Sequence, residues 1–342
     1  MRYSTLKAFK FPDRLEAIQT REPAGPVHVQ IILSDLCNQS CHFCAYRDPS
    51  YTSSQLFHVD GNYNPNRMIP YEKVLEILDD CVEMGVQAIQ LTGGGEPTVH
   101  PRFGDIVQEI LDRGLKWALV TNGVLANKWD LSTATWVRVS LDAATPQTYA
   151  RIRRVPENHF HKACDTIARV RPGVGFVVTP ENWREVVQAA QLAKSLGASN
   201  MRIGAQFSVA GEDLYAEIRS TAAEYCRAAM ELGDETFTVV NRFSEKLEDL
   251  SQGQPNYSLC GYQYFTTYIG ADQNLYRCCV YAYNPHGLIG SIKGRRFRDV
   301  WREIAYPDFQ LFQAQSCERC QFNTINRAIN EVLTPDPSET FV

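Results

Sequence analysis

Three cysteines near the start of the chain have a spacing that suits an iron–sulfur cluster. Cys37, Cys41 and Cys44 form a C-x3-C-x2-C pattern directly after an apolar stretch. Cysteine thiolates hold iron–sulfur clusters, and a cubane cluster has four irons to coordinate. Three neighbouring ligands can wrap one cluster and leave its fourth iron open to a small molecule. The alternative is a zinc loop, although zinc sites more usually pair two C-x2-C units or add histidines.

A second group of cysteines lies near the other end of the chain. It comprises Cys260, the adjacent pair Cys278 and Cys279, and a C-x2-C pair, Cys317 and Cys320. Four thiolates would coordinate a cubane cluster fully, or equally a tetrahedral zinc ion, and spacing alone does not decide between them. The fifth, Cys279, is a spare residue, an alternative ligand, or a thiol that donates hydrogen to a substrate radical.

Two polar turns follow strand-like segments between these cysteine groups. The first is Gly93-Gly94-Gly95-Glu96-Pro97, where glycines let the backbone approach a ligand closely and a carboxylate could bind an ammonium group. The second is Thr121-Asn122-Gly123, which is either a simple turn or a ligand contact. On its own, each turn is also explained as an ordinary connection between a strand and a helix.

Together these motifs resemble those of the radical S-adenosylmethionine (radical SAM) superfamily, in which an aromatic residue such as Phe43 precedes the third cysteine. The later cysteines, with a glycine in the hairpin between them, are similar to a twitch domain, a relative of the SPASM domain. The resemblance spans roughly residues 25–330. It implies a [4Fe-4S] cluster with one open iron on the first three cysteines, bound S-adenosylmethionine, and an auxiliary [4Fe-4S] cluster on the later set, which consists of Cys260, Cys278, Cys317 and Cys320.

The resemblance also implies contacts with the cofactor. The Gly-Gly-Glu turn would bind the amino group of S-adenosylmethionine, while a serine and an arginine would reach its ribose or carboxylate, which a guanidinium can bind bidentately. Arg151 and Arg154 are alternatives to the arginine we prefer, and Arg202 is a further candidate near a later strand. The residues assigned to cofactor binding are Phe43, Gly94, Gly95, Glu96, Ser140, Arg153 and Asn182.

Strand-like and helix-like segments alternate around these motifs. This alternation predicts parallel strands with crossover helices, and chemistry at the C-terminal ends of the strands. The expected fold is α/β, a partial (βα)6 barrel followed by a small α+β domain with a β-hairpin. Strands are predicted over 27–33, 88–92, 117–121, 136–141, 174–179 and 200–205, and helices over 71–84, 103–113, 161–170, 183–196, 213–232, 297–304 and 321–333.

Four segments are expected along the chain. Residues 1–26 form a lead-in, 27–235 the barrel, 236–334 the auxiliary-cluster domain and 335–342 a tail. The hairpin turn is predicted at Gly270-Ala271-Asp272-Gln273. Residues 46–69 form a long loop that is either a substrate-facing lid or a solvated insertion. Its candidate contact residues are Tyr46, Arg47, Tyr51, Tyr63 and Arg67.

The composition is that of a soluble globular protein. Of 342 residues, 44% are hydrophobic and 21% charged, and the net charge of −5 gives no general attraction to nucleic acid or to an anionic membrane. We find no long apolar run and no secretion signal, so we expect a cytoplasmic protein whose cysteines are ligands rather than disulfides. Cys81, Cys164 and Cys226, in helix-like segments, are expected to be buried small hydrophobes.

The resemblance implies reductive cleavage of S-adenosylmethionine to methionine and a 5′-deoxyadenosyl radical, which removes hydrogen from a substrate carbon. An auxiliary cluster that accepts an electron favours oxidation or cross-linking of a peptide or natural-product precursor, with flavodoxin or ferredoxin as electron donor. No separate leader-binding domain is evident at the N-terminus, which weighs against a peptide.

Two alternatives stay open. The first is a radical epimerase that uses Cys279 or Cys226 as hydrogen donor. The second is a non-enzymatic, metal-stabilised module that binds nucleic acid through a basic stretch, although the net charge argues against it. The residues of this basic stretch are Arg277, Lys293, Arg295, Arg296, Arg298 and Arg302.

Overall fold

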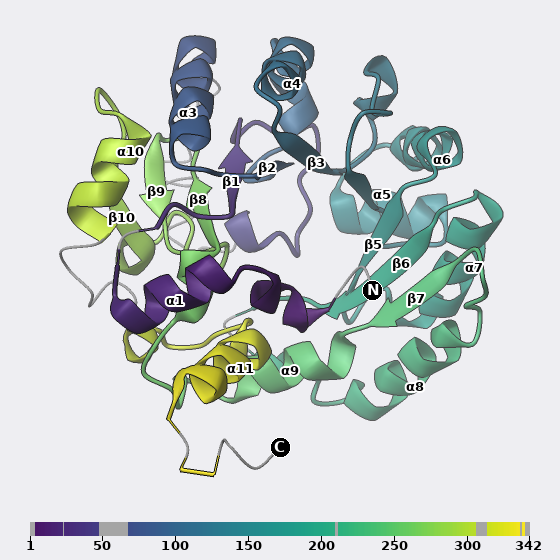
Figure 1. The fold of residues 1–342 in the computed structure, drawn as a ribbon. Helices are drawn as coiled ribbons and strands as arrows, with labels where there is room; N and C mark the ends of the chain where they lie inside the picture. Colours follow the sequence, from purple (N-terminus) through teal and green to yellow (C-terminus); the bar gives the residue numbers. More distant parts are fainter. Residues whose placement is uncertain are drawn as a thin grey trace.

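The computed structural model describes residues 4–22, 24–47, 68–208, 211–305, 313–335 and 337–338. Within these residues, ten strands form one curved sheet in the order β10-β9-β8-β1-β2-β3-β4-β5-β6-β7 (Figure 1). The strands from β8 to β7 in this order are parallel, whereas β9 and β10 pair antiparallel with their neighbours. The predicted α/β fold with a partial parallel barrel is confirmed.

The strands are short, as is usual for a twisted parallel sheet. They are β1 (His28–Ile32), β2 (Ala88–Thr92), β3 (Lys116–Thr121), β4 (Trp136–Ser140), β5 (Gly173–Val178), β6 (Asn200–Ala205), β7 (Thr238–Asn241), β8 (Thr266–Ile269), β9 (Asn274–Tyr276) and β10 (Leu288–Ser291). The main helices are α1 (Pro12–Thr20), α3 (Tyr71–Glu83), α4 (Phe103–Asp112), α5 (Pro146–Arg153), α6 (Asn158–Val170), α7 (Val186–Ser195), α8 (Arg219–Met230), α9 (Phe243–Ser251), α10 (Phe297–Val300) and α11 (Asn323–Leu333).

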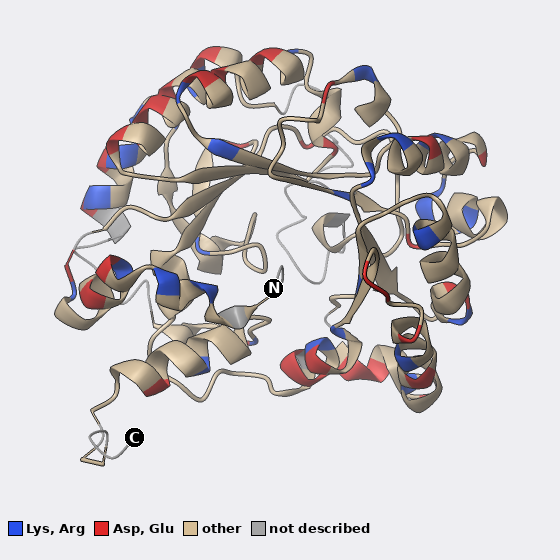
Figure 2. Cartoon of the chain, turned by 45° about the vertical axis from the view of Figure 1, so that its right-hand side comes forward, with Lys and Arg blue, Asp and Glu red and all other residues tan. Residues whose placement is uncertain are grey.

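The helices α3, α4, α6, α7 and α8 lie on the outside of the sheet (Figure 1). Lys and Arg residues alternate with Asp and Glu along these helices, while the strands are mostly other residue types (Figure 2). Helix α3 illustrates how such a helix packs on the sheet: Val74, Ile77 and Leu78 recur at helical spacing and are fully buried. Their burial contributes about 1.5–3 kcal/mol for each side chain.

One parallel strand was not predicted. The alternation continues through α8 to β7, which pairs with β6 from Asn200↔Thr238 to Ile203↔Asn241. The sequence signal is weak because this strand has four residues, of which Val239 alone is buried. The predicted long helix over 213–232 is a short 3₁₀ helix, Gly211–Tyr215, followed by α8.

The C-terminal part of the chain continues the same sheet. The hairpin strand β8 pairs in parallel with β1, from His28↔Thr266 to Ile31↔Ile269. A 3₁₀ helix, Gly261–Tyr264, precedes the first strand of the hairpin. The domain boundary at residues 235–236 remains a prediction, since β8 to β10 share their sheet with the barrel strands.

Three further predictions concern cysteines, the long loop and membranes. Cys81 and Cys226 are buried as expected, but Cys164 on α6 is partly exposed. Of the expected loop contacts, Tyr51, Tyr63 and Arg67 lie outside the described residues. Among the described helices, none combines the length and the apolar character needed to span a membrane.

Candidate active site and second thiol site

The first cysteine loop lies against the C-terminal end of α5. The backbone N–H of Ser40 donates to the carbonyl of Arg153 (3.1 Å), and that of His42 donates to the carbonyl of Ile152 (3.2 Å). The ring Nδ1 of His42 lies 3.0 Å from the same Ile152 oxygen. The last carbonyls of a helix have no partner within the helix. The cysteine loop therefore satisfies the end of α5, and α5 in turn fixes the loop.

The glycine turn after β2 packs on the same cysteine loop. The register of β1 and β2 aligns Ile32 with Thr92, so the segments that follow the two strands leave the sheet together. The N–H of Gly95 donates to Ser34 O, and the N–H of Glu96 donates to Leu36 O, both at 2.8 Å. A Cβ on residue 95 would overlap the Leu36 carbonyl. This close approach therefore requires glycine.

The carboxylate of Glu96 joins the ends of β2 and β3. Its Oε1 accepts from the hydroxyls of Thr98 and Thr121, each at 2.6 Å, and from the Thr98 N–H at 3.3 Å. Its Oε2 accepts the N–H of Asn122 at 2.7 Å. Burial raises the pKa of Glu96, and these donors oppose that rise. Because a carboxylate offers about four acceptor positions, an ammonium group would approach Oε2, and this contact remains a prediction.

Asn122 was not among the predicted cofactor-binding residues. Its Nδ2 donates to the Asn38 carboxamide at 2.6 Å and lies 3.9 Å from Cys37 Sγ. Burial raises the pKa of Cys37 to about 12, and Glu96 adds to the rise. Such a thiol ionises when a metal cation stabilises the thiolate. The amide donor facing the sulfur fits a cluster ligand at this position, and Thr121-Asn122-Gly123 was the signal for it.

Arg153, predicted to bind a cofactor carboxylate, is held by protein groups around the cysteine loop through both of its terminal nitrogens. Its Nη1 donates to Gln39 Oε1 at 2.6 Å and lies 3.9 Å from Cys41 Sγ. Its Nη2 donates to the Ser140 carbonyl at 2.8 Å and pairs with Asp142. Burial opposes the charge, but nearby acidic groups, Tyr149 and Asp142 first, raise the Arg153 pKa above its ordinary value.

The amide of Asn182 is engaged in the same way. Its Nδ2 donates to the carbonyls of Asp142 (2.8 Å) and Val177 (2.9 Å), and its Oδ1 accepts the N–H of Thr179 (2.7 Å). The side chain is 1% exposed. Asn182 therefore fixes the ends of β4 and β5 relative to each other. The predicted cofactor contacts of Ser140, Arg153 and Asn182 remain predictions.

Sequence reasoning missed the partners that anchor the cysteine loop from a distance. Gln39 lies inside the loop, and its Nε2 donates to the Tyr149 hydroxyl at 2.8 Å. Asp142 follows β4 with a left-handed backbone (φ +56°), and its Oδ1 accepts the N–H of Val177 at 2.7 Å. Phe43 lies beside this group, with its ring centroid 6.0 Å from the Arg153 guanidinium. The sequence Ser140-Leu141-Asp142-Ala143 carried the one available signal, an aspartate directly after a strand.

The second set of cysteines lines one cavity. Cys260, Cys278, Cys317 and Cys320 share a pocket of about 320 Å³, counting the space that is open to solvent. Among the described residues, no group of three or more His, Cys, Asp or Glu side chains is close enough together to bind one single metal ion. The thiols therefore line the walls of the cavity. The ring of Tyr262 stacks on Phe322 in the same wall, with centroids 3.9 Å apart.

Hydrogen-bond donors face the sulfurs of this cavity. The Nδ2 of Asn326 lies 3.8 Å from Sγ of both Cys260 and Cys320, and the N–H of Phe322 lies 3.2 Å from Cys320 Sγ. Donors of this kind stabilise thiolates and tune the clusters that they hold. The donor set therefore fits an iron–sulfur cluster.

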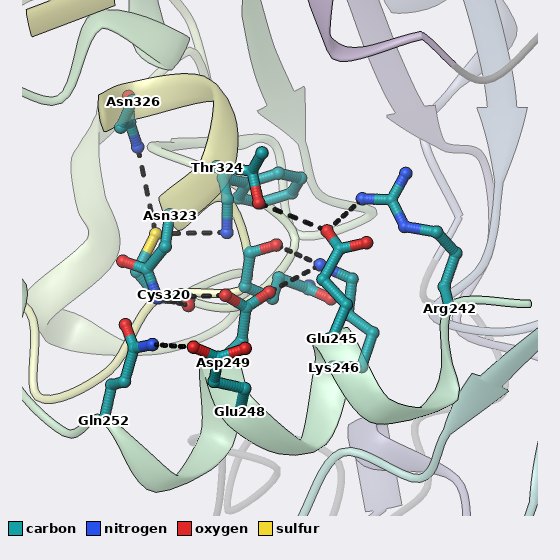
Figure 3. A network of polar contacts seen from close by, with 12 residues as sticks. Arg242, Glu245, Lys246, Glu248, Asp249, Gln252, Cys320, Asn323, Thr324 and Asn326 are labelled. Carbon is teal, nitrogen blue, oxygen red and sulfur yellow. Dashed lines mark hydrogen bonds and ion pairs between the residues drawn. The ribbon is translucent and has the colours of Figure 1, made fainter. Parts of the chain in front are cut away.

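A polar network behind the cavity holds the C-x2-C segment in place. Asn323 donates to the Cys320 carbonyl (2.7 Å) and to Asp249 (3.1 Å), which also accepts from Lys246 (2.7 Å; Figure 3). The network connects α9 with α11 (Figure 3). The sequence gave no local signal for Asn323 or Asn326, both of which are almost fully buried.

Cys279 does not line the cavity of the four cysteines. Its Sγ lies 2.9 Å from Gln321 Nε2, and its side chain packs against a small cluster that includes Tyr268 and Tyr283. Tyr46, just after the first cysteine loop, packs against the same cluster. Burial raises the pKa of the Cys279 thiol. Cys279 thus shares a cluster with Tyr46, which follows the first cysteine loop.

The basic stretch considered for nucleic acid is largely used inside the protein. Arg296 pairs with the fully buried Asp80 at 2.5 Å, and Arg298 pairs with Asp80 and Glu83. Further pairs in the stretch are Arg295 with Glu303 and Arg302 with Glu83. Arginines engaged in this way dock the C-terminal part on α3, which weighs against a nucleic-acid surface.

Comparison with known proteins agrees with the geometry of both sites. The family model of the radical SAM superfamily matches residues 31–193, and that of an iron-sulfur cluster-binding domain, SPASM, matches residues 260–321. The first match includes Cys37, Cys41 and Cys44, and the second begins at Cys260 and includes Cys320. The radical SAM domain implies S-adenosylmethionine and a [4Fe-4S] cluster, and the SPASM domain implies auxiliary iron–sulfur chemistry.

Curated relatives match over part of their length. A "Probable GTP 3',8-cyclase" of Saccharolobus islandicus is 27% identical over 186 residues, which cover 51% of this chain and 55% of the relative. A "Tungsten-containing aldehyde ferredoxin oxidoreductase cofactor-modifying protein" of Pyrococcus furiosus is 30% identical over 149 residues, covering 39% and 42%. The chain thus spans about half the length of the curated relatives it matches.

Solved structures share the fold at low sequence identity. Streptococcus suis SuiB bound to S-adenosylmethionine gives a TM-score of 0.63 at 14% identity, covering 86% of this chain and 70% of SuiB. Native anSMEcpe with bound AdoMet and the Cp18Cys peptide gives 0.57 at 15% identity, covering 83% and 82%. At such identities the likeness concerns the fold alone. The two domain matches show that this chain carries a radical SAM domain over residues 31–193 and, after it, a SPASM domain over residues 260–321.

Proposed function

We propose that this chain is a radical SAM oxidoreductase that removes hydrogen from an unactivated carbon and oxidises or cross-links a peptide or natural-product precursor. The observation that carries the proposal is the docking of the Gly95-Glu96 turn on the cysteine loop. Two backbone hydrogen bonds, Gly95 N–Ser34 O and Glu96 N–Leu36 O, hold the turn that is predicted to bind the cofactor against the loop of the three thiols. Cofactor and cluster would therefore share one site.

The residues of the first site divide into ligands and supports. Cys37, Cys41 and Cys44 would hold the cluster, and the turn at Gly94, Gly95 and Glu96 would receive the amino group of S-adenosylmethionine. Together, cluster and cofactor supply a 5′-deoxyadenosyl radical. Asn122 and Arg153 direct N–H donors at the sulfurs of Cys37 and Cys41, respectively. These donors orient the thiolates and offset their negative charge.

The second site supports oxidation over simple hydrogen exchange. Cys260, Cys278, Cys317 and Cys320 would hold an auxiliary [4Fe-4S] cluster, which supplies an acceptor for the electron left on a substrate radical. The buried amide of Asn326 faces two of these sulfurs. Net loss of one hydrogen atom, one electron and one proton from the substrate gives an unsaturated or cross-linked product.

A peptide substrate is favoured by the nature of one structural neighbour. SuiB has been crystallised with the precursor peptide SuiA, and that structure gives a TM-score of 0.63 at 14% identity, covering 93% of this chain and 77% of SuiB. The shared fold can accommodate a peptide, although identity this low transfers no specificity. Flavodoxin or ferredoxin as electron donor and a cytoplasmic location complete the proposal.

The decisive experiment measures cofactor cleavage by the anaerobically reconstituted chain. We expect about eight irons per chain, the content of two cubanes, and 5′-deoxyadenosine after reduction with dithionite. Cys41→Ala should abolish 5′-deoxyadenosine formation. Cys226→Ala, which removes a buried thiol of α8, serves as the matched control and should retain it. Uptake of zinc at the first site, or absence of cleavage in the fully loaded protein, would refute the proposal.

Epimerisation is a second candidate because of the position of Cys279. Its side chain packs with Tyr268 and Tyr283 outside the cavity of the four cysteines, and Tyr46, which follows the first cysteine loop, packs against the same cluster. An epimerase would return a hydrogen atom from this thiol to the substrate radical, so solvent deuterium would enter the product. Cys279→Ala would then cleave S-adenosylmethionine without forming product. Oxidation predicts a product two mass units lighter, with no deuterium incorporated from solvent.

A further inference from the structure

A large basic pocket lies at the opposite ends of the barrel strands from the first cysteine loop. It has a volume of about 840 Å³ and reaches the beginnings of β4, β5 and β6, with Trp136, Gly173 and Asn200 in its lining. The N-terminal 3₁₀ helix, Thr5–Lys10, contributes Lys7 to the lining. A cavity of this size is within the range of ligand sites in proteins, about 300–1,000 Å³.

Three arginines line this pocket. Arg138 comes from β4, Arg169 from the last turn of α6, and Arg171 from the turn between α6 and β5. Among the residues that the structure describes, none of these guanidiniums forms an ion pair with Asp or Glu. Arg169 donates to the carbonyl of Ala126 at 3.0 Å. The carboxylate in the lining, Asp130, accepts the N–H of Ser132 at 2.9 Å. The Ser132 hydrogen bonds lower the pKa of Asp130, and the nearby Arg169 charge adds to this effect.

This arrangement contrasts with the rest of the molecule. The chain has 39 acidic and 34 basic residues, so carboxylates are available to pair with arginine. Arg296 and Arg298 both pair with Asp80, and Arg113 pairs with Asp79 and Glu109. Three arginines gathered around one cavity without such partners create a positive potential there, and low-dielectric walls focus it.

An exposed aromatic ring completes the pocket. Trp136 is the first residue of β4 and is 41% exposed, although it is large and apolar. The Arg138 guanidinium lies 5.8 Å from its ring centroid. An indole in this position offers a flat apolar surface beside cationic groups. Such a combination suits a ligand that carries both apolar groups and negative charge.

The backbone favours separated carboxylates over a compact group of phosphates. Helix α6 ends at Val170, and Val170 and Arg171 line the pocket. The C-terminal end of a helix carries a partial negative charge, which disfavours a dense anion. The arginines themselves come from a strand, the last turn of a helix and the turn that follows that helix. Carboxylates spaced along an extended chain can meet each arginine in turn, and the guanidinium fork binds each one bidentately.

We propose that this pocket binds an acidic segment of a peptide, with glutamate or aspartate side chains held by Arg138, Arg169 and Arg171. The identification of that peptide as the substrate rests on the proposed function. The binding itself does not, because it involves neither cofactor nor cluster site. A peptide anchored here would be held at one end of the barrel while another part of it reaches the site beside the first cysteine loop.

The test uses the full chain with its clusters loaded and a fluorescent peptide of about ten residues that alternates glutamate with glycine. Fluorescence anisotropy should report binding that weakens as salt is raised, because exposed charges are screened. The matched peptide with glutamine in place of glutamate should bind at least about tenfold more weakly. Adenosine triphosphate and pyrophosphate serve as competitors that carry phosphate instead of carboxylate.

Variants assign the binding to this pocket. Arg138→Gln combined with Arg171→Gln should weaken peptide binding about tenfold or more, since it removes two charge-assisted contacts. Arg227→Gln, on the exposed side of α8, is the matched control and should bind as the wild type does. Circular dichroism and the midpoint of thermal unfolding establish that each variant is folded.

Three outcomes would overturn the inference: equal binding of both peptides, binding of the phosphate compounds in preference to the glutamate peptide, or unchanged binding by the folded double variant. The result is separable from that of the proposed function. If the peptide binds to a chain that fails to cleave S-adenosylmethionine, the proposed function fails and the pocket assignment stands. If cleavage proceeds while the peptide does not bind, the pocket assignment alone fails.

Discussion

Arg153 and Asp142 form a buried ion pair, each side chain only 3% exposed, between the end of α5 and the turn after β4. The same guanidinium reaches Gln39 in the cysteine loop at 2.6 Å. One side chain therefore connects the loop that carries three thiols to the strand that ends at Ser140. The position of the cysteine loop depends on a charge pair that water does not reach.

Removal of one partner of this pair should be strongly destabilising. Breaking a buried ion pair by substitution of one member typically costs about 3–5 kcal/mol, because an uncompensated charge stays buried. We therefore expect Arg153→Gln and Asp142→Asn each to lower the free energy of unfolding by about 3 kcal/mol. The double variant should lose less than the sum. Urea denaturation of the cluster-free chain measures this coupling, and strictly additive losses would show that the two residues act independently.

Gly95→Ala should separate the turn after β2 from the cysteine loop. The added Cβ would overlap the Leu36 carbonyl, so the hydrogen bond from Gly95 N to Ser34 O must lengthen. We expect less iron at the first site. We also expect less S-adenosylmethionine to stay bound to the protein during gel filtration. Gly204→Ala is the control, because a Cβ there meets nothing within 4 Å. Equal iron content in both variants would contradict the argument.

The motifs of the candidate site were readable because their chemistry is local in sequence. Cys37 to Cys44 span eight residues, and Gly95 follows a strand whose bounds, Ala88–Thr92, matched the prediction. The parallel barrel was readable for a similar reason, since strands and helices alternate with clear periodicity. β7 escaped detection because four residues, Thr238–Asn241, carry too little pattern.

The supports of the site could not be read because their partners are far apart in the chain. Gln39 and Tyr149 are separated by 110 residues, and Asn326 lies 66 residues from the Cys260 sulfur that it faces. Polar residues of this kind are common on any surface. The fold alone reveals that Asn326 is fully buried and directed at a thiol. Sequence reasoning thus found residues with distinctive chemistry and missed the ordinary residues that hold them.

The ion pairs of Asp80 should dominate the docking of the C-terminal part on α3. Asp80 is fully buried and pairs with Arg296 and Arg298. We expect Asp80→Asn to lower the free energy of unfolding by about 2 kcal/mol, since the charged donors lose their acceptor. The neighbouring Asp79 is the matched control, because it pairs with Arg113 but its side chain is 55% exposed.

Exposed ion pairs contribute about 0–1 kcal/mol, so Asp79→Asn should be nearly neutral. Hydrogen exchange of α10 should accelerate in Asp80→Asn and stay unchanged in Asp79→Asn. Equal losses of unfolding free energy in the two variants would contradict the prediction that the buried Asp80 contributes more than the exposed Asp79.

His28 should make the protein less stable in mild acid. It begins β1, and its Nε2 lies 3.1 Å from the Thr266 hydroxyl on β8. Burial lowers the pKa of His28 from 6.5 to about 4. Between these two values the unfolded chain binds a proton that the folded chain does not, so the stability of the folded state falls as the pH drops from 6.5 towards 4. Above pH 6.5 the ring is neutral in both states and has no such effect.

His28→Gln keeps an amide near Thr266 and removes the titration. The variant should match the wild type at pH 7 and exceed it at pH 5 by on the order of 1 kcal/mol, less than full burial would give because the ring keeps part of its exposed surface. Urea denaturation of both proteins across this range measures the difference. The other histidines, the buried His100 among them, are common to both proteins and cancel. If the free energies of unfolding of the two proteins changed in parallel with pH, His28 would have the same pKa in the folded and unfolded states. That result would contradict the prediction.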